Sequence, residues 1–224
     1  MLWRKDRVFA IKIGVDCGDG LRHLGNLEDG GEVCSGDEFG SLISSMRLGG
    51  VDSAEAVNFD TTALVAIVSG ISNGSAERLL NAPEDEMRRR FKSNYEFVVA
   101  QVTSEVQLPI LAELRDAIAG KKGIICESVC SEFKELISMC GGPNEKLRAE
   151  QLIKRLLIVP DCPSTRIMDL PTTRKIAMKN KVVFGTGDYW HAPTLTANMG
   201  FARAISQTGS TQPLSTGKHA RKLM

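Results

Sequence analysis

The sequence predicts an α/β protein in which helices cover both faces of a central, mostly parallel sheet. Three short apolar segments, at 56–60, 123–126 and 156–159, have the length and composition of buried strands. Segments with helical spacing of apolar residues separate them, and strands that alternate with helices favour parallel pairing. Together these observations predict a three-layer α/β/α fold over residues 55–209.

The first strand of this domain is expected at 56–60. The apolar residues between 64 and 71 then recur at helical spacing, and Ser72-Asn73-Gly74 ends that helix. Two further helices are expected, one opening at 81–86 and one at 109–119. Both are predicted from a proline or acidic residues near the start, which suit a helix N-terminus.

The remaining elements follow in order along the chain. They are a strand at 123–126, helices at 128–140 and 144–154, a strand at 156–159, a helix at 172–178, a strand at 182–184 and a helix at 194–205. The strand at 182–184 runs into Gly185-Thr186-Gly187-Asp188. Because glycines allow a sharp turn, this strand is expected to deliver a carboxylate to the edge of the sheet.

The two ends of the chain differ from its centre. Residues 1–54 hold ten of the 21 glycines and are predicted to be a peripheral, partly disordered extension. Its apolar pieces at 8–15 and 42–46 are expected to form an edge strand and a short helix. The tail at 210–224 is polar and basic, has no apolar run that could add a strand, and is expected to be mobile.

Composition excludes several classes of protein. Lys and Arg number 28 against 27 Asp and Glu, so the overall charge does not indicate nucleic-acid binding, and any basic surface must be local. The six cysteines include no Cys-x-x-Cys pair typical of zinc sites. With no secretory signal and no stretch of transmembrane length, we expect an intracellular protein, cytoplasmic or nuclear, with reduced thiols and no membrane partner.

Several carboxylates are predicted to meet at the carboxyl ends of the strands, where open parallel sheets bind ligands. Asp60 and Asp188 each follow a predicted strand, and Glu132 lies at the edge of the apolar stripe of the next helix. Asp169 is the fourth candidate, with Asp161 as its competitor. Carboxylates that converge without basic partners need a divalent cation, and oxygen ligands alone select Mg²⁺ or Mn²⁺.

Each of these residues also has a simpler interpretation. Asp60, Asp169 or Asp188 alone suits a helix cap or turn, and Glu132 alone suits a solvated helix face. The combination, rather than any single member, favours the metal site. The basic run at 87–92 and the basic residues at 174–181 are either phosphate contacts or solvated faces.

Two other kinds of site fit less well. Gly185-Thr186-Gly187 lacks the third glycine of a dinucleotide-binding motif, because Trp190 occupies that position. His191 fits a surface or packing residue better than a general base.

The ordered motifs resemble those of PIN-like domains. They are Asp60-Thr61-Thr62-Ala63-Leu64, Ser128-Val129-Cys130-Ser131-Glu132 and Thr186-Gly187-Asp188, and the resemblance covers roughly residues 56–205. The nineteen-residue gap from Asp169 to Asp188 is similar to that between the third and fourth acids of the superfamily. The run 184–201 resembles an uncharacterised eukaryotic branch of it, a domain-of-unknown-function family.

The resemblance implies a metal-dependent ribonuclease fold. Asp60, Glu132 and Asp188, with Asp169, would hold Mg²⁺ or Mn²⁺ and a metal-bound water that hydrolyses phosphodiester bonds, while Thr186 would orient the site by hydrogen bonding. The alternative is a catalytically inactive PIN-like module that binds RNA or protein partners through the same face.

Overall fold

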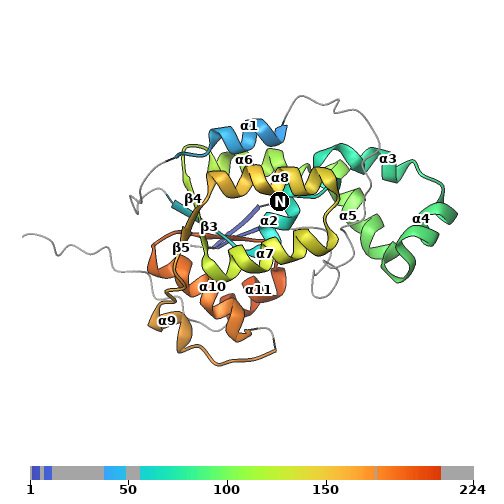
Figure 1. Cartoon of the computed structure of the whole chain (residues 1–224). Helices are drawn as coiled ribbons and strands as arrows, with labels where there is room; N and C mark the ends of the chain where they lie inside the picture. The colour runs from blue at the N-terminus through green and yellow to red at the C-terminus, as the bar shows by residue number, and fades with distance from the viewer. Residues whose placement is uncertain (1, 6–7, 12–37, 49–55, 175, 208–224) are drawn as a thin grey trace, which may run out of the picture.

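The computed structural model describes residues 2–5, 8–11, 38–48, 56–174 and 176–207 (Figure 1). Within them, six strands form one sheet in the order β1-β2-β6-β3-β4-β5. The strands are β1 (Leu2–Lys5), β2 (Val8–Ile11), β3 (Ala56–Phe59), β4 (Lys122–Cys126), β5 (Leu157–Val159) and β6 (Thr194–Thr196). From β2 to β5 every neighbouring pair is parallel, and β1 alone pairs antiparallel. The expected central, mostly parallel sheet is confirmed.

Helices cover the sheet on both sides, as Figure 1 shows with α2 and α8 above it and α10 and α11 below it. The helices are α1 (Glu38–Ser45), α2 (Thr61–Val68), α3 (Ala76–Leu80), α4 (Glu84–Phe91), α5 (Tyr95–Gln107), α6 (Ile110–Ile118), α7 (Glu127–Cys140), α8 (Pro143–Arg155), α9 (Thr165–Met168), α10 (Met178–Tyr189) and α11 (Met199–Gln207). The main core is built largely from aliphatic side chains, and Phe59, Phe133 and Phe201 are fully buried in it.

Most of the predicted elements are confirmed. The predicted strands at 56–60, 123–126 and 156–159 are β3, β4 and β5. The predicted helices between residues 64 and 154 correspond to α2, α4, α6, α7 and α8. In the N-terminal extension, β2 and α1 occupy parts of the two expected elements, but β2 lies between β1 and β6 and is therefore not the expected edge strand. Residues 12–37, 49–55 and 208–224 lie outside the described residues, and the predictions of disorder and mobility fall there.

The predictions for the last third of the chain are wrong at three places. The expected strand at 182–184 is part of helix α10, and the expected helix at 194–205 begins as strand β6 and becomes helical only in α11. Of the expected helix at 172–178, the described residues before Met178 are not helical, and Thr173 and Ile176 exchange two hydrogen bonds of 3.2 and 3.0 Å. Helix α9 forms earlier than expected.

The glycines of α10 explain why an apolar, β-branched run forms a helix there. A Cβ atom on Gly187 would come within 2.4 Å of Thr194 Oγ1 and 2.8 Å of Asn58 Nδ2. A Cβ atom on Gly185 would come within 2.7 Å of Pro163. The two glycines let the helix lie directly against the sheet and against the segment before α9. They therefore serve close packing and not a turn toward a ligand.

Residues 71–107 form a separate structure that we call the helical arm. It contains α3, α4 and α5, and in Figure 1 these helices extend away from the sheet. The arm has its own buried cluster: Ile71, Ala76, Leu79, Met87, Phe91, Val98 and Val102. The arm lies in the crossover between β3 and β4 and does not contribute to the main core.

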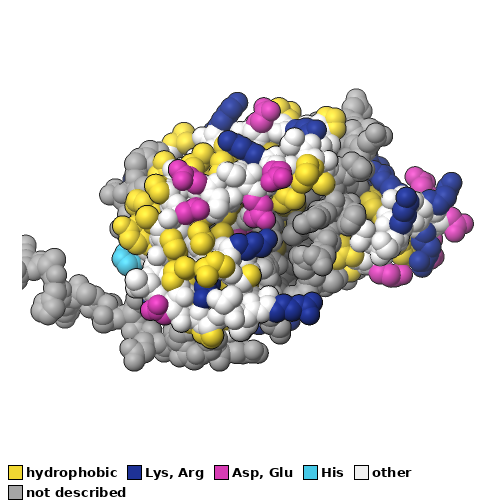
Figure 2. All heavy atoms as spheres, turned by 60° about the horizontal axis from the view of Figure 1, so that its bottom comes forward, with side chains coloured by type: hydrophobic (Ala, Val, Ile, Leu, Met, Phe, Trp, Pro, Cys, Tyr) yellow, Lys and Arg dark blue, Asp and Glu magenta, His cyan; other side chains and the backbone are white. Residues whose placement is uncertain are grey.

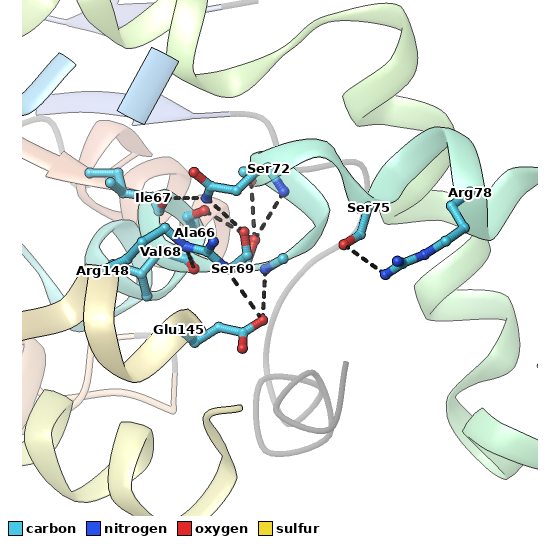
Figure 3. Close-up of polar contacts among 11 residues, drawn as sticks. Ala66, Ile67, Val68, Ser69, Ser72, Ser75, Arg78, Glu145 and Arg148 are labelled. Atoms are coloured by element: carbon cyan, nitrogen blue, oxygen red, sulfur yellow. Dashed lines mark hydrogen bonds and ion pairs between the residues drawn. The ribbon is translucent and has the colours of Figure 1, made fainter. Parts of the chain in front are cut away.

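The entry to the arm is fixed to helix α8 (Figure 3). Arg148 Nε donates to the carbonyl of Val68 at 2.9 Å, and Glu145 Oε1 accepts from the N–H of Gly70, also at 2.9 Å. Asn73 Nδ2 donates to the carbonyls of Ile67 and Ser69 at 2.9 and 2.7 Å. These bonds satisfy backbone groups that the end of α2 leaves without helical partners.

The exit from the arm is held by Glu105. Its carboxylate accepts the N–H of Ile110, the first residue of α6, at 3.0 Å, and the Ser72 side chain at the arm's entry is close enough to this carboxylate to act to lower its pKa. Burial raises the pKa of Glu105 to about 7. One carboxylate thus joins the two ends of the arm.

Candidate site at the carboxyl edge of the sheet

Asp60 follows β3 directly and caps helix α2. Its Oδ1 accepts the N–H of Ala63 at 2.8 Å, and the Thr62 hydroxyl donates to Oδ1 at 2.8 Å and to Oδ2 at 3.0 Å. The Thr196 hydroxyl also donates to Oδ2. Asp60 is only 6% exposed, and burial raises its pKa to about 6 even though these hydrogen bonds act to lower it.

The same hydroxyls connect the ends of two neighbouring strands. The N–H of Ala197 donates to Thr62 Oγ1 at 2.9 Å, and the N–H of Asn198 donates to Thr196 Oγ1 at 2.9 Å. The carboxyl end of β6 is thereby bound to the start of α2. Asp60 lies at the centre of a network of neutral donors.

Glu132 lies one turn into α7 and reaches toward the same edge. Its Oε2 accepts the hydroxyl of Thr61 at 2.7 Å, and its Oε1 accepts Lys179 Nζ from α10 at 3.3 Å. Glu132 thus contacts Thr61, the residue next to Asp60 in the chain, at the start of α2. The Glu132 side chain is 42% exposed, so this carboxylate faces solvent.

Asp188 has a different position from the one expected. It lies within α10, where its Oδ2 accepts the Ser164 hydroxyl at 2.6 Å and its Oδ1 forms an ion pair with Arg166 of α9. Thr186, fully buried in the same helix, accepts the N–H of Cys162 at 3.1 Å. These contacts hold the segment around α9 against α10.

Asp161, and not Asp169, lies at the end of a strand. Asp161 follows β5, and its Oδ1 accepts the backbone N–H and the hydroxyl of Ser128, each at 3.1 Å, at the start of α7. Asp169 is exposed at the C-terminal end of α9. Beside it, Lys181 of α10 is buried and donates to the carbonyls of Met168 and Leu170. This burial removes Lys181 from the predicted basic surface at 174–181.

The strand beside β3 at this edge is β6, and it does not end in a carboxylate. Its end is Thr196-Ala197-Asn198, and the Asn198 side chain accepts the N–H of Phe201 at 3.1 Å at the start of α11. The sequence analysis assigns no site role to Thr62 or Thr196, and it places Lys179 only among the basic residues at 174–181 and not beside Glu132. Thr196 was expected inside a helix. A strand prediction for Thr194–Thr196 would indicate this role, because Thr196 is then a polar residue at the carboxyl end of a strand.

The chemistry of this edge follows from its partners. Asp60 and Glu132 could offer oxygen ligands to one hard cation, but both already accept hydrogen bonds or a lysine within the chain. In the described part of the chain, no group of three or more His, Cys, Asp and Glu side chains is placed to hold a metal ion.

The fold and this edge define a three-layer α/β protein with a polar site where its parallel strands end. The family described as protein of unknown function (DUF1308) matches residues 57–216, so the chain belongs to that family. The match begins in β3 and includes every residue of the candidate site. No solved structure matches the chain.

The described helices differ in whether they meet the length and hydropathy of a membrane span alone or in pairs. None of them alone has the length and hydropathy to cross a bilayer. One pair, Glu84–Gln107 with Ile110–Ile118, meets the length and composition criteria together but is bent by 61°.

Proposed function

We propose that this chain is a PIN-like module that binds RNA at the carboxyl edge of its sheet without cleaving it. One observation carries the proposal: the three carboxylates expected to share a metal ion each have partners within the chain. Asp188 pairs with Arg166, Glu132 pairs with Lys179, and Asp60 accepts hydroxyls and an N–H. A divalent cation held by all three would have to displace these partners.

The same ion pairs supply contacts for phosphate. The side chains of Arg166 and Lys179 are 42% and 73% exposed, so each guanidinium or ammonium group is accessible from solvent while it neutralises a carboxylate. Each cation could donate to a phosphate oxygen of a nucleic-acid backbone. Figure 2 shows basic, acidic and hydrophobic side chains interspersed on one face of the molecule, with no large area of one charge. Such a surface favours binding through a few placed cations over a strong general field.

A second candidate function is a Mg²⁺- or Mn²⁺-dependent ribonuclease, and the convergence of Asp60 and Glu132 across Thr61 favours it. In this candidate, Asp60, Glu132, Asp188 and Asp169 would hold the ion, and Thr186 would orient the site. The bound ion would activate water for attack on the phosphodiester. The chain's own residues would have to release Asp188 from Arg166 for this arrangement to form.

One experiment separates the two functions. Binding of labelled single-stranded RNA is measured by fluorescence anisotropy, and cleavage of the same RNA is measured with Mn²⁺ and with a chelator. The variants are Asp60→Asn, Glu132→Gln and Asp188→Asn. Glu135→Gln is the matched control, because Glu135 is exposed on the same helix as Glu132.

We expect the wild type to bind RNA, and we expect no cleavage by the wild type or by any variant. We also expect Arg166→Ala/Lys179→Ala to lower the slope of log K against log salt by about 1.4, because two phosphate contacts to a single strand are lost. Cleavage that needs Mn²⁺ and is lost in Asp60→Asn and Glu132→Gln, but kept in Glu135→Gln, would replace the proposal with the ribonuclease. Absence of RNA binding would contradict both and leave a protein partner as the ligand of this edge.

A further inference from the structure

We propose that Tyr189 is a base-stacking residue for single-stranded RNA, on a path along the solvent-facing side of α10. This inference rests on the RNA-binding function proposed above, and it narrows the ligand from RNA in general to RNA with unpaired bases. Proteins bind single strands by combining cations that contact phosphates with aromatic rings on which bases stack. Arg166 and Lys179 are the cations of the proposed function, and Tyr189 supplies the ring.

Tyr189 differs from the other aromatic residues in its exposure. It is 56% exposed, whereas every other aromatic side chain whose exposure the structure describes is buried or half-buried. A tyrosine ring of this kind offers a flat apolar surface to a base. Single exposed apolar residues are ordinary on protein surfaces. The position of Tyr189 among charged groups therefore matters more than its exposure alone.

The ring of Tyr189 is held from one side. It packs edge-on against the ring of Trp190, with the ring centres 5.8 Å apart and the planes at 83°. Trp190 is half-buried and packs against the main core. A ring that is supported before the ligand arrives loses less conformational entropy when a base stacks on it. Tyr189 is therefore better prepared for stacking than an isolated side chain.

The helical geometry of α10 places Tyr189 between the two cation sites. Successive residues turn by about 100°, so Lys179 and Asp188, nine positions apart, lie on opposite sides of the helix. Tyr189 lies between these two directions, about 80° from the first and 100° from the second. Phe184 and Gly187 occupy the other face of the helix and are buried. The ring of Tyr189 therefore leaves α10 on its solvent side.

The charges on either side of this face suit a phosphate backbone. Arg166 pairs with Asp188, the residue next to Tyr189, and its side chain is 42% exposed. Lys179 pairs with Glu132 at 3.3 Å and is 73% exposed. It lies ten residues from Tyr189, which is about 15 Å along the helix axis. Single-strand sites extend over about four nucleotides or more, so one strand can reach both cations and the ring.

The stacking role selects single strands over duplexes. In a duplex the faces of the bases are covered by their neighbours, and aromatic side chains stack on bases that are unpaired and turned outward. Met178 extends the apolar contact, because it lies three helical turns before Tyr189 on the same side of α10 and is 52% exposed. The ligand that fits this face is therefore an unpaired stretch of RNA, with bases on the apolar side chains and phosphates at the cations.

The test measures affinity and salt dependence together. Binding of labelled single-stranded polyuridine is followed by fluorescence anisotropy across a salt series for the wild type, Tyr189→Ala and Tyr189→Phe. Leu147→Ala is the matched control, because Leu147 is an apolar residue of α8 that is 55% exposed. We expect Tyr189→Ala to weaken binding about tenfold at every salt concentration. The slope of log K against log salt should stay unchanged, because a ring and not a charge is removed.

Two comparisons separate stacking from a general defect. Tyr189→Phe keeps the ring and should bind polyuridine within about twofold of the wild type, as should Leu147→Ala. The second comparison uses an RNA duplex of the same length. Tyr189→Ala and the wild type should bind the duplex equally, since neither stacks a paired base. The preference for single strands should therefore fall about tenfold in Tyr189→Ala.

The outcomes distinguish this inference from the proposed function. If the wild type binds polyuridine and Tyr189→Ala binds it equally well, the stacking role is overturned and RNA binding stands. The same conclusion holds if Tyr189→Phe is as weak as Tyr189→Ala, or if Tyr189→Ala loses single strands and duplex to the same extent. If the wild type binds no RNA, both are overturned. A loss confined to Tyr189→Ala and to single strands supports the inference.

Discussion

Asp60 and Asp188 were expected to play one role, and the structure gives them opposite surroundings. Asp188 is neutralised by Arg166 and accepts the Ser164 hydroxyl. Asp60 is buried among threonine hydroxyls and a backbone N–H, and burial raises its pKa to about 6. The comparison teaches that an aspartate within two residues of a threonine in sequence can be either a cap in a neutral network or half of an ion pair. Only the partner, which is distant in sequence, decides between them.

The largest change in the free energy of unfolding is expected for a substitution that disturbs the packing of α10 near Asp188. Gly187→Ala places a methyl group 2.4 Å from Thr194 Oγ1 and 2.8 Å from Asn58 Nδ2, two side chains that are hydrogen-bonded to each other at 3.0 Å. We expect the free energy of unfolding to fall by about 3 to 4 kcal/mol, measured by urea denaturation. Met178→Ala, at an exposed position of the same helix, is the control and should change it by less than about 0.5 kcal/mol. Equal effects would show that α10 does not depend on this close approach.

The second largest effect is expected in the pH dependence of the free energy of unfolding, which tests whether Asp60 lies in buried, neutral surroundings. Because the folded-state pKa is raised, the folded protein binds more protons than the unfolded chain between pH 4 and 6, and stability falls as pH rises through this window. Asp60→Asn removes this titration. Between pH 4 and pH 7 the wild type should therefore lose about 2 to 3 kcal/mol of unfolding free energy relative to the variant. Parallel pH profiles of the two proteins would show that Asp60 titrates normally.

A smaller effect tests the ion pair of Asp188. Arg166→Ala leaves a carboxylate that is 13% exposed without its cation, and Asp188→Asn relieves that charge. In a double-mutant cycle we expect a coupling of about 1 kcal/mol in unfolding free energy, reduced from that of a buried pair because the Arg166 side chain is 42% exposed. High salt should reduce this coupling. No measurable coupling would mean that partners other than Arg166, the Ser164 hydroxyl among them, compensate Asp188.

The smallest effect concerns Glu132. Its partner Lys179 is 73% exposed, so Lys179→Ala should change the free energy of unfolding by no more than about 0.5 kcal/mol. The same variant should weaken RNA binding, since the proposed function uses this cation. A large loss of stability would instead mark Lys179 as a structural residue.

The centre of the fold could be predicted from the sequence because local pattern and tertiary environment agree there. The segments at 56–60 and 123–126 are short apolar runs, and β3 and β4 are buried throughout. At Val182–Phe184 the same kind of run forms a helix. A short apolar run fits a strand or a buried helix equally well, and the close contacts of Gly185 and Gly187 that select the helix involve distant residues.

In the candidate site, too, the sequence predicts only the residues that belong to correctly predicted strands and helices. Asp60 ends the predicted strand at 56–60, and Glu132 lies on the helix that follows the predicted strand at 123–126. Because the carboxyl ends of parallel strands lie at one edge of the sheet, both residues could be expected there. Thr196 could not be found, because β6 has only three residues and was taken for the start of a helix. The pairing of Asp188 with Arg166 depends on how α9 packs against α10, which no local pattern in the sequence encodes.

The carboxylate of Glu105 has a consequence for how this chain can change. Because it touches both Ser72 and Ile110, the polypeptide leaves and re-enters the body at a single point. Insertions, deletions or replacements in the segment between Ser72 and Ile110 should therefore have little effect on the register of β3 against β4. The two ends of the segment stay together, and the entropy cost of closing a loop rises slowly with its length. Glu105 thus fixes the point at which the helical arm joins the rest of the fold, and the arm itself can vary in length and sequence.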